Sequence, residues 1–531
     1  MVVTAAVGAI GRGDETARRL FPVLGCGIVL GLAAACGDAG LPQPLDAGVS
    51  AAPDLGEAAD ATVEVLDAAV PADAGEISRR DASVVVPDAG ASADAATVPN
   101  DLEIQGWVET FPDKPLQAVL RLTSEVPVGV SIRLVGPGVD REIVRPKLNQ
   151  QHAMMLLALR SDSTYDVLVD AISADELKGA LTLSFQTGEL QSGLQSQLNV
   201  TVNEPSPDRG YTFFGVTGNS PEYVAVDSEG FIVWHYPLRP WEASAASIIR
   251  PLGPGRLLIM LADEFRIIDT AGNTLHRYVQ PPEVPSPFHH EGVMLPDGRL
   301  LALSSEVRPT QTPDFGPINV LADIVVELDP NSNLLSRWSS FDTLDPTRFP
   351  GPLSRQGGSG TLDWTHSNAI DYSPVDDTYL VSVRNQNWVV NVDRATQQVL
   401  WKLGEDGDFD LTAGEWFTSQ HASAWTSTGE LMLYDNGNES SPQRSRAVVY
   451  ALDMDSMTAQ QTWEWRVPFF TPVVGDIDEL SSGFLVTAGI GSGPWPASIF
   501  EVSNTGQVRW QLEVRGNFVY RAERVAEISP P

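Results

Sequence analysis

Residues 389–403 read VVNVDRATQQVLWKL, which is an apolar strand, a turn that begins with Asp, and a second strand with an aromatic residue near its end. An Asp followed by small polar residues favours a hairpin turn. The pattern occurs in five other places, at residues 224–236, 266–278, 325–338, 450–465 and 500–512. The copies lie about 40 to 65 residues apart, close to the length of a propeller blade. The sequence therefore predicts an all-β chain whose main domain is a six-bladed β-propeller.

A shorter apolar strand precedes each hairpin and carries the candidate site. Counting back eight residues from the turn glycines Gly298 and Gly429 reaches His290 and His421, and His366 opens the corresponding strand of the blade between them. A histidine taken alone is most simply a satisfied polar side chain. Blades are arranged radially, so three histidines at one structural position would point to a common centre.

Convergent histidines can bind a metal ion, or they can act as nucleophile and acid/base. Arg384 lies on the strand that follows His366, and Asn368 lies two residues from His366 on the same expected face. A guanidinium and an amide suit a tetrahedral oxyanion better than a cation. We therefore expect an anion site without a metal. Strand alternation predicts that His289 points away from its neighbour.

Three segments around these residues resemble the bacterial aryl-sulfate sulfotransferases, also called arylsulfotransferases. They are HHEGVMLPDGRLLAL (289–303), the long segment 363–404, and QHASAWTSTGELMLYDNGN (420–438), in the order found in that family. The resemblance implies transfer of a sulfuryl group from a phenolic sulfate ester to a phenol, without a nucleotide sulfate donor or a cofactor. It also implies that His421 is transiently sulfated. The chain departs from the family at Glu291, where Asp is usual, and at Ala422, where an acid is common.

The resemblance assigns roles to the other matching residues. Arg384 and Asn368 would hold the sulfuryl oxygens, and His290 or His366 would protonate the leaving phenolate and then deprotonate the acceptor phenol. Nearby aromatic side chains could contact a phenol ring, although packing between blades is the simpler role for most of them: Phe288, Trp364, Trp388, Trp416, Phe417, Trp425 and Trp495. The alternatives are a non-catalytic ligand-binding or scaffold propeller lipoprotein of the cell envelope, and a metal-dependent propeller hydrolase.

The N-terminal segment predicts export. An apolar run at residues 20–35 follows three arginines, as in a signal peptide, and the residues before Cys36 resemble a lipobox. Residues 1–36 would thus be a signal peptide with a lipidation site at Cys36. Residues 37–100 are rich in Ala, Asp and Pro and predict a disordered linker. We expect a periplasmic or cell-surface lipoprotein of a bacterial envelope, attached to the membrane by its lipid anchor.

The remaining chain divides into two predicted domains. Residues 101–205 contain β-rich runs separated by turns, which predict an Ig-like β-sandwich of about seven short strands, and residues 206–531 form the propeller. The net charge of −35 argues against nucleic-acid binding. Both cysteines, Cys26 and Cys36, precede the predicted domains, so we expect no disulfide in the folded body. The chain could also form a homodimer, and the sequence does not decide its oligomeric state.

Overall fold

The computed structural model describes residues 102–531, except 218–220, 244–247, 313–315, 351–353, 356–359 and 492. The predicted signal peptide, the lipidation site at Cys36 and the linker therefore lie outside the described residues. In the described part, all regular structure is β-strand apart from short single helical turns. No helix there is long and apolar enough to cross a membrane.

The first domain is a bent antiparallel sheet of five strands, fewer and longer than expected. They are β1 (Ile104–Phe111), β2 (Lys114–Gly136), β3 (Val139–Leu156), β4 (Thr164–Ser173) and β5 (Lys178–Gln186). The register of β2 against β3 shifts between Thr123 and Val128, so the two halves of β2 belong to different parts of the bent sheet. Strict alternation of buried and exposed residues in β4 shows that one face packs on a core.

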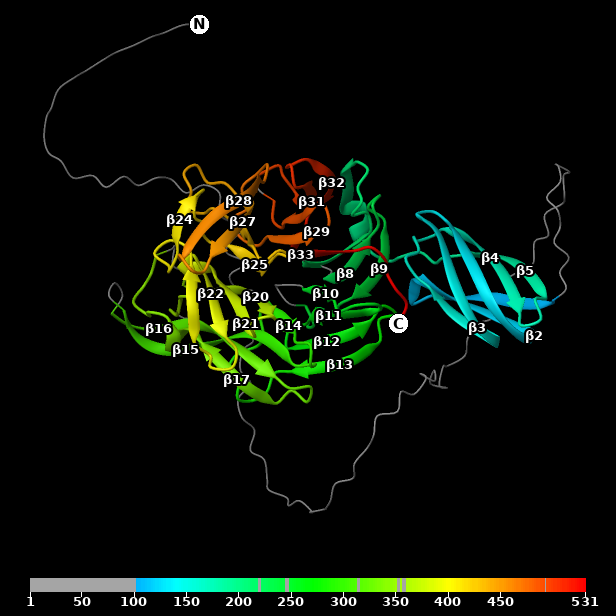
Figure 1. Cartoon of the computed structure of the whole chain (residues 1–531), viewed down its shortest axis with the longest axis horizontal. Coiled ribbons are helices and arrows are strands. Elements are labelled where there is room, and N and C mark those ends of the chain that lie inside the picture. The colour runs from blue at the N-terminus through cyan, green and yellow to red at the C-terminus, as the bar shows by residue number, and fades with distance from the viewer. Residues whose placement is uncertain are drawn as a thin grey trace, which may run out of the picture.

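Six further sheets form the blades of a propeller (Figure 1). The second blade contains β10 (Ile249–Pro251), β11 (Arg256–Met260), β12 (Glu264–Asp269) and β13 (Thr274–Val279). The third contains β14 (Gly292–Met294), β15 (Leu300–Thr312), β16 (Gly316–Leu328) and β17 (Leu334–Ser339), with β18 (Ser354–Arg355) and β19 (Leu362–Asp363) beside β16. The fourth contains β20 (Ser367–Ser373), β21 (Thr378–Val383), β22 (Trp388–Asp393) and β23 (Val399–Leu403).

The fifth blade contains β25 (His421–Trp425), β26 (Leu431–Asp435), β27 (Arg446–Asp453) and β28 (Thr458–Arg466), with β24 (Asp410–Ala413) at its edge. The sixth contains β29 (Asp476–Leu480), β30 (Gly483–Ala488), β31 (Ala497–Ser503) and β32 (Val508–Val514). The predicted all-β architecture with six propeller blades is confirmed.

Both ends of the propeller sequence close the ring. The first blade joins β7 (Tyr211–Thr217), β8 (Glu222–Val226) and β9 (Ile232–Pro237) to the C-terminal strand β33 (Phe518–Val525), which pairs with β7. The strand β6 (Leu198–Asn203), which the sequence placed with the first domain, pairs with β32 in the sixth blade. The first and sixth blades are therefore each completed by strands distant in sequence.

Aromatic residues of the repeats lie between neighbouring blades. The ring of Trp463 in the fifth blade packs against Phe484 in the sixth at a centroid distance of 4.4 Å. The indole N–H of Trp234 in the first blade donates to the carbonyl of Thr270 in the second at 2.7 Å. The repeated aromatic residue thus joins blades by apolar contact and, at some positions, by a hydrogen bond.

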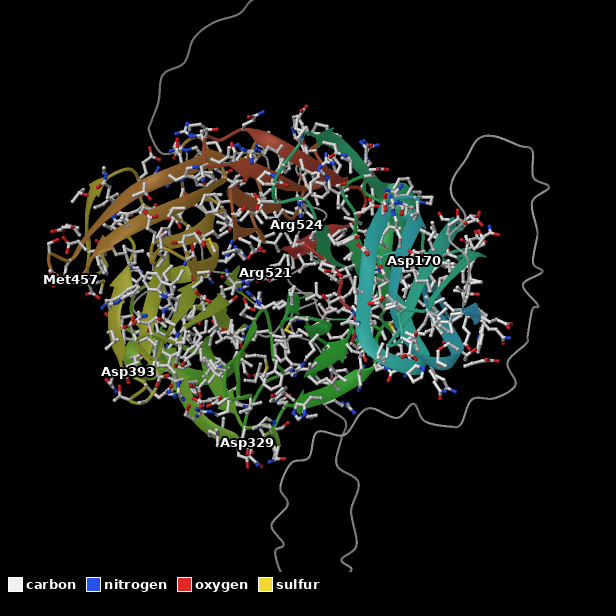
Figure 2. The ribbon with its side chains drawn as sticks, turned by 45° about the vertical axis from the view of Figure 1, so that its right-hand side comes forward. Asp170, Asp329, Asp393, Met457, Arg521 and Arg524 are labelled. Carbon is white, nitrogen blue, oxygen red and sulfur yellow. The ribbon has the colours of Figure 1, made fainter. Side chains whose placement is uncertain are left out.

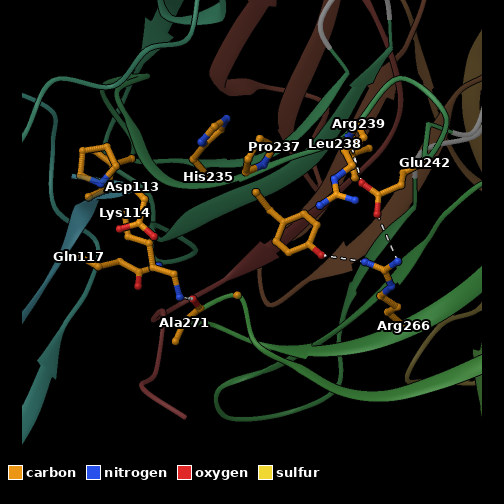
Figure 3. Close-up of a pocket in the computed structure, with 14 residues that line it drawn as sticks. Asp113, Lys114, Gln117, His235, Pro237, Leu238, Arg239, Glu242, Arg266 and Ala271 are labelled. Atoms are coloured by element: carbon orange, nitrogen blue, oxygen red, sulfur yellow. Dashed lines mark hydrogen bonds and ion pairs between the residues drawn. The ribbon is translucent and has the colours of Figure 1, made fainter. Parts of the chain in front are cut away.

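The first domain contacts the turns that connect the two outer strands of each of the first two blades. The side-chain ammonium of Lys114 donates to the carbonyl of Ala271 at 2.7 Å, and the guanidinium of Arg160 pairs with Asp227 at 2.7 Å. A cleft of about 530 Å³ lies at this junction, with Lys114, Tyr236 and Arg266 in its wall (Figure 3). The cleft shares no residue with the histidine site described next.

Candidate active site

The three predicted histidines lie at one edge of three consecutive blades. His290 lies two residues before the innermost strand β14, His366 immediately precedes β20, and His421 is the first residue of β25. The backbone is left-handed at His290 (φ 57°), at His366 (φ 48°) and at Ala422 beside His421 (φ 53°). Such residues break the regular strand and turn side chains away from their ordinary direction.

The histidine rings converge as the common register implied. The ring centroids of His290 and His366 are 5.3 Å apart. The ring of Tyr520 contacts both His290 and His421, at centroid distances of 5.7 Å and 6.3 Å. Side chains from four segments distant in sequence therefore lie together inside the ring of blades.

The hydrogen bonds of His421 determine which of its nitrogens carries the proton. Its Nδ1 lies 2.6 Å from Oδ1 of Asn436. The Asn436 amide nitrogen donates to the carbonyls of Thr471 and Val474 at 2.7 and 2.8 Å, so the atom facing His421 is the acceptor oxygen. Nδ1 is thus the donor, and in the neutral ring Nε2 keeps its lone pair. Burial lowers the pKa of His421 well below 6.5, and the Arg384 cation acts in the same direction.

His366 forms a pair with a carboxylate three residues earlier. Its Nδ1 lies 2.5 Å from Oδ2 of Asp363, and the side chain of Asp363 is only 6% exposed. The carboxylate accepts a hydrogen bond from the Nδ1–H group. It can stabilise the imidazolium that forms when Nε2 also binds a proton. This arrangement suits a group that gives and takes a proton.

His289 does not point away from its neighbour, contrary to the prediction. Its Nδ1 lies 2.9 Å from Nδ1 of His290, and its Nε2 lies 3.3 Å from Asp323. Alternation fails because both histidines precede β14, which begins only at Gly292, and because His290 is left-handed. Burial lowers the pKa of His290 well below 6.5, and the adjacent His289, His366 and His421 act in the same direction.

Arg384 is a half-buried cation with no carboxylate within ion-pair distance among the described residues. Its two terminal nitrogens donate to Oδ1 of Asn385 at 2.9 Å and to the carbonyl of Pro472 at 3.2 Å. Its Nε is buried and has no hydrogen-bond partner in the part of the chain that the structure describes. Burial lowers the pKa of Arg384. A buried, unpaired donor on a cation is the feature expected of an anion-binding site.

Asn368 is fully buried and forms part of the connection between blades. It falls at the register shift between Ser367 and Ala369, so its position differs from that expected for a regular strand. Its amide nitrogen donates to the carbonyl of Gln420 at 2.8 Å, immediately before His421. One amide hydrogen is therefore already used for contact with the segment that carries His421.

The seven aromatic candidates separate by burial. Phe288, Trp364, Trp388 and Phe417 are buried in the packing between strands, and Trp416 and Trp425 are partly buried. Trp495 is 48% exposed and stacks on Phe469 with ring centroids 5.6 Å apart. Among them, Trp495 is the ring with most of its surface open to a ligand.

The sequence interpretation missed the side chains that orient this site. Asp363 and Asn436 lie inside the quoted segments, so their spacing from His366 and His421 could have identified them. Tyr520 and Arg521 come from the closing strand β33, and no local pattern marks them. Within the described residues, no group of three or more His, Cys, Asp or Glu side chains is arranged to hold a metal ion.

The fold and site define a β-propeller whose convergent imidazoles and unpaired arginine form a candidate centre for transfer of an anionic group. The model of the arylsulfotransferase (ASST) family matches residues 191–521, and the chain belongs to this family. The arylsulfate sulfotransferase AssT of Escherichia coli O6:H1 is 23% identical over 262 residues, which are 36% of this chain and 42% of that protein. The AssT of Lelliottia amnigena is 22% identical over 255 residues, with the same coverage. The chain thus spans about two fifths of the length of these curated relatives.

Solved structures with similar architecture are distant. A protein of unknown function from Bacteroides caccae has a TM-score of 0.40 and 15% identity, covering 60% of this chain and all of that one. A periplasmic gluconolactonase from Pseudomonas aeruginosa has a TM-score of 0.34 and 10% identity, covering 60% of this chain and 99% of that one.

Proposed function

We propose that the chain transfers a sulfuryl group from a phenolic sulfate ester to a phenolic acceptor through a sulfated His421. The observation that carries the proposal is the pairing of a neutral nucleophile with an unpaired cation. Asn436 holds the His421 proton on Nδ1, which leaves the Nε2 lone pair for attack on sulfur. Arg384 lies close enough to His421 to lower its pKa, and its terminal nitrogens donate to an amide and a carbonyl oxygen rather than to a carboxylate.

The first half-reaction forms a bond between His421 Nε2 and sulfur and breaks the bond between sulfur and the phenolic oxygen. Negative charge is spread over the equatorial sulfuryl oxygens, by analogy with phosphoryl transfer. The free Nε of Arg384 is the available donor for these oxygens. The leaving phenolate takes a proton from His366, and the Asp363 carboxylate stabilises that imidazolium.

The second half-reaction reverses these roles. His366 removes the proton of the acceptor phenol, whose oxygen attacks the sulfuryl group on His421 and releases the neutral imidazole. We assign acid/base catalysis to His366 rather than His290, because His366 has a buried carboxylate partner. His290 takes no proton in this scheme, and its ring packs against that of His366 with centroids 5.3 Å apart.

Trp495 is a candidate platform for the aromatic ring of the substrate. It lies in the loop between β30 and β31, and Phe469 lies in the loop before β29. Strands alternate in direction within a blade, so the first strand starts at the edge where the second strand ends and the third begins. His421 is at the start of the first strand of the fifth blade, and the Trp495 loop connects the second and third strands of the sixth blade. Both therefore lie at the same edge of the propeller. Phe469 also precedes Thr471, whose carbonyl accepts from Asn436.

The direct test is intact-mass and peptide analysis of the protein after exposure to 4-nitrophenyl sulfate. We expect one sulfuryl group on His421, followed by its transfer to phenol. His421→Ala should lose both steps, whereas His276→Ala, on the outer strand β13, should keep both. Binding of the donor without any mass gain in the wild-type protein would instead support a non-catalytic ligand-binding propeller.

We also propose that the chain is exported and lipidated at Cys36. The support is the apolar run at residues 20–35 and the small residues before Cys36. Cys36→Ser should move the full-length protein from the membrane fraction to the soluble exported fraction. An unchanged membrane fraction would contradict the lipid anchor.

A further inference from the structure

A buried ion-pair network lies beside the histidines inside the ring of blades. The carboxylate of Glu291 is fully buried and accepts two hydrogen bonds from Arg250, at 3.1 and 3.0 Å. The same carboxylate forms an ion pair with Arg521, whose side chain is 5% exposed. Glu291 directly follows His290, and Arg521 directly follows Tyr520, so the pair joins two segments that carry rings of the site.

Arg521 also reaches the segment that carries Asn368. One terminal nitrogen of its guanidinium donates to the backbone carbonyl of Asn368 at 3.1 Å, and the hydroxyl of Tyr520 donates to the same carbonyl at 3.1 Å. The Asn368 amide in turn donates to the carbonyl of Gln420. A continuous chain of contacts therefore runs from the residue after His290 to the residue before His421.

The two arginines near the histidines, half-buried Arg384 and buried Arg521, differ in their partners. Arg384 has no carboxylate within ion-pair distance in the described chain, and its terminal nitrogens donate only to Asn385 and to the carbonyl of Pro472. The Nε of each arginine lacks a hydrogen-bond partner among the described residues, so the difference between them lies in their ion pairs. The charge of Arg521 is offset by Glu291, and Asp476 lies 3.8 Å from its Nε. A neutralised guanidinium with fixed protein partners is suited to holding backbone in place, whereas the unneutralised one is suited to binding an anion.

We propose that Glu291 and Arg521 are a positioning pair, which sets the distance between His290 and His421 by tying the closing strand β33 to the segments before β14 and β25. This inference rests on the proposed sulfuryl transfer. Its physical basis is that displacement of reacting groups by about 1 Å can reduce the rate on the order of a hundredfold. It also gives a reason for Glu at position 291, where Asp is usual in the family. The longer side chain brings the carboxylate into contact with arginines from two other blades at once.

The test compares Glu291→Gln, Arg521→Met and the double variant in the full chain. The assay is transfer from 4-nitrophenyl sulfate to phenol, with the rate of His421 sulfation measured in a single turnover. We expect each single variant to lose on the order of a hundredfold in kcat, with KM for the donor nearly unchanged because Arg384 is intact. The double variant should be no slower than the slower single variant, because both substitutions remove one interaction.

Arg524→Met is the matched control. Arg524 lies on the same strand as Arg521, and both are labelled in Figure 2. Its side chain is as buried as that of Arg521 and pairs with Glu501 at 3.1 Å, whereas Arg521 pairs with Glu291. The Arg524→Met variant should show a comparable loss of thermal stability and a wild-type kcat. If Arg521→Met does not fold, Arg521→Lys and Glu291→Asp replace it in the test, because they retain the charges. They should still lower kcat and leave KM for the donor unchanged.

The outcomes separate the two proposals. Turnover by the wild-type protein together with unchanged kcat in folded Glu291 and Arg521 variants would overturn the positioning role alone. Strictly additive losses in the double variant, or an equal loss of kcat in Arg524→Met, would also overturn it. Absence of transfer and of sulfohistidine in the wild-type protein would overturn the proposed function, and the positioning role with it.

Discussion

Replacing Arg384 with Met should separate catalysis from stability. The cation has no carboxylate partner in the described chain and makes two protein hydrogen bonds, to Asn385 and to the carbonyl of Pro472. The Pro472 carbonyl keeps a second donor, Asn438, at 3.0 Å. Because a partly desolvated charge without an ion-pair partner is costly, its removal offsets the lost bonds, and we expect the free energy of unfolding to stay within about 1 kcal/mol of wild type.

The catalytic effect of the same change should be much larger. If the unpaired Nε of Arg384 donates to the sulfuryl oxygens, its loss removes about 3 kcal/mol of transition-state stabilisation, or on the order of a hundredfold in kcat. Arg384→Lys keeps the charge but not the planar set of donors, so it should recover only part of the rate. Urea denaturation gives the stability, and release of 4-nitrophenol gives the rate.

The pH profile provides a second measurement on this variant. The Arg384 cation contributes to lowering the pKa of His421, so its removal raises that pKa. His421 must be neutral to attack, and the decline in rate at low pH should therefore begin at higher pH than in the wild type. Arg394→Met, at the opposite edge of the same blade, should leave the profile unchanged. A wild-type rate in Arg384→Met would refute the assignment of the anion site.

Three other changes test separate parts of the site. Asp363→Asn should lower kcat about a hundredfold, since His366 loses the carboxylate that stabilises its imidazolium; an unchanged burst of 4-nitrophenol would contradict this. Trp495→Ala should raise KM for the aryl substrate while leaving stability nearly unchanged, because its ring is 48% exposed; calorimetric binding of the donor provides the check. Burial raises the pKa of Glu523 from 4.5 to about 7, so its stabilising contribution is present below pH 4.5 and is lost as pH rises through about 7. Glu523→Gln should therefore raise stability by at most about 3 kcal/mol above pH 7 and have little effect below pH 4.5, as denaturation at both pH values would show.

Much of the propeller could be predicted because its repeats are local. Each hairpin needs only a strand, a turn and a second strand within about 15 residues, as in 389–403. The pattern does not depend on what the rest of the chain does. The first domain was harder, since β2 is one strand of 23 residues whose halves pair differently around a register shift, and turn residues within it suggest several short strands.

The sequence by itself determined the six repeats and the common position of His290, His366 and His421, because radial repetition turns equal register into spatial convergence. Only the tertiary structure decided which atoms these rings present. The left-handed backbone at His290 and His366 reverses the expected alternation, and Asn436 selects the proton position on His421. Tyr520 and Arg521 reach the centre only through closure of the ring by β33, a pairing with β7 over roughly 300 residues that no local pattern encodes.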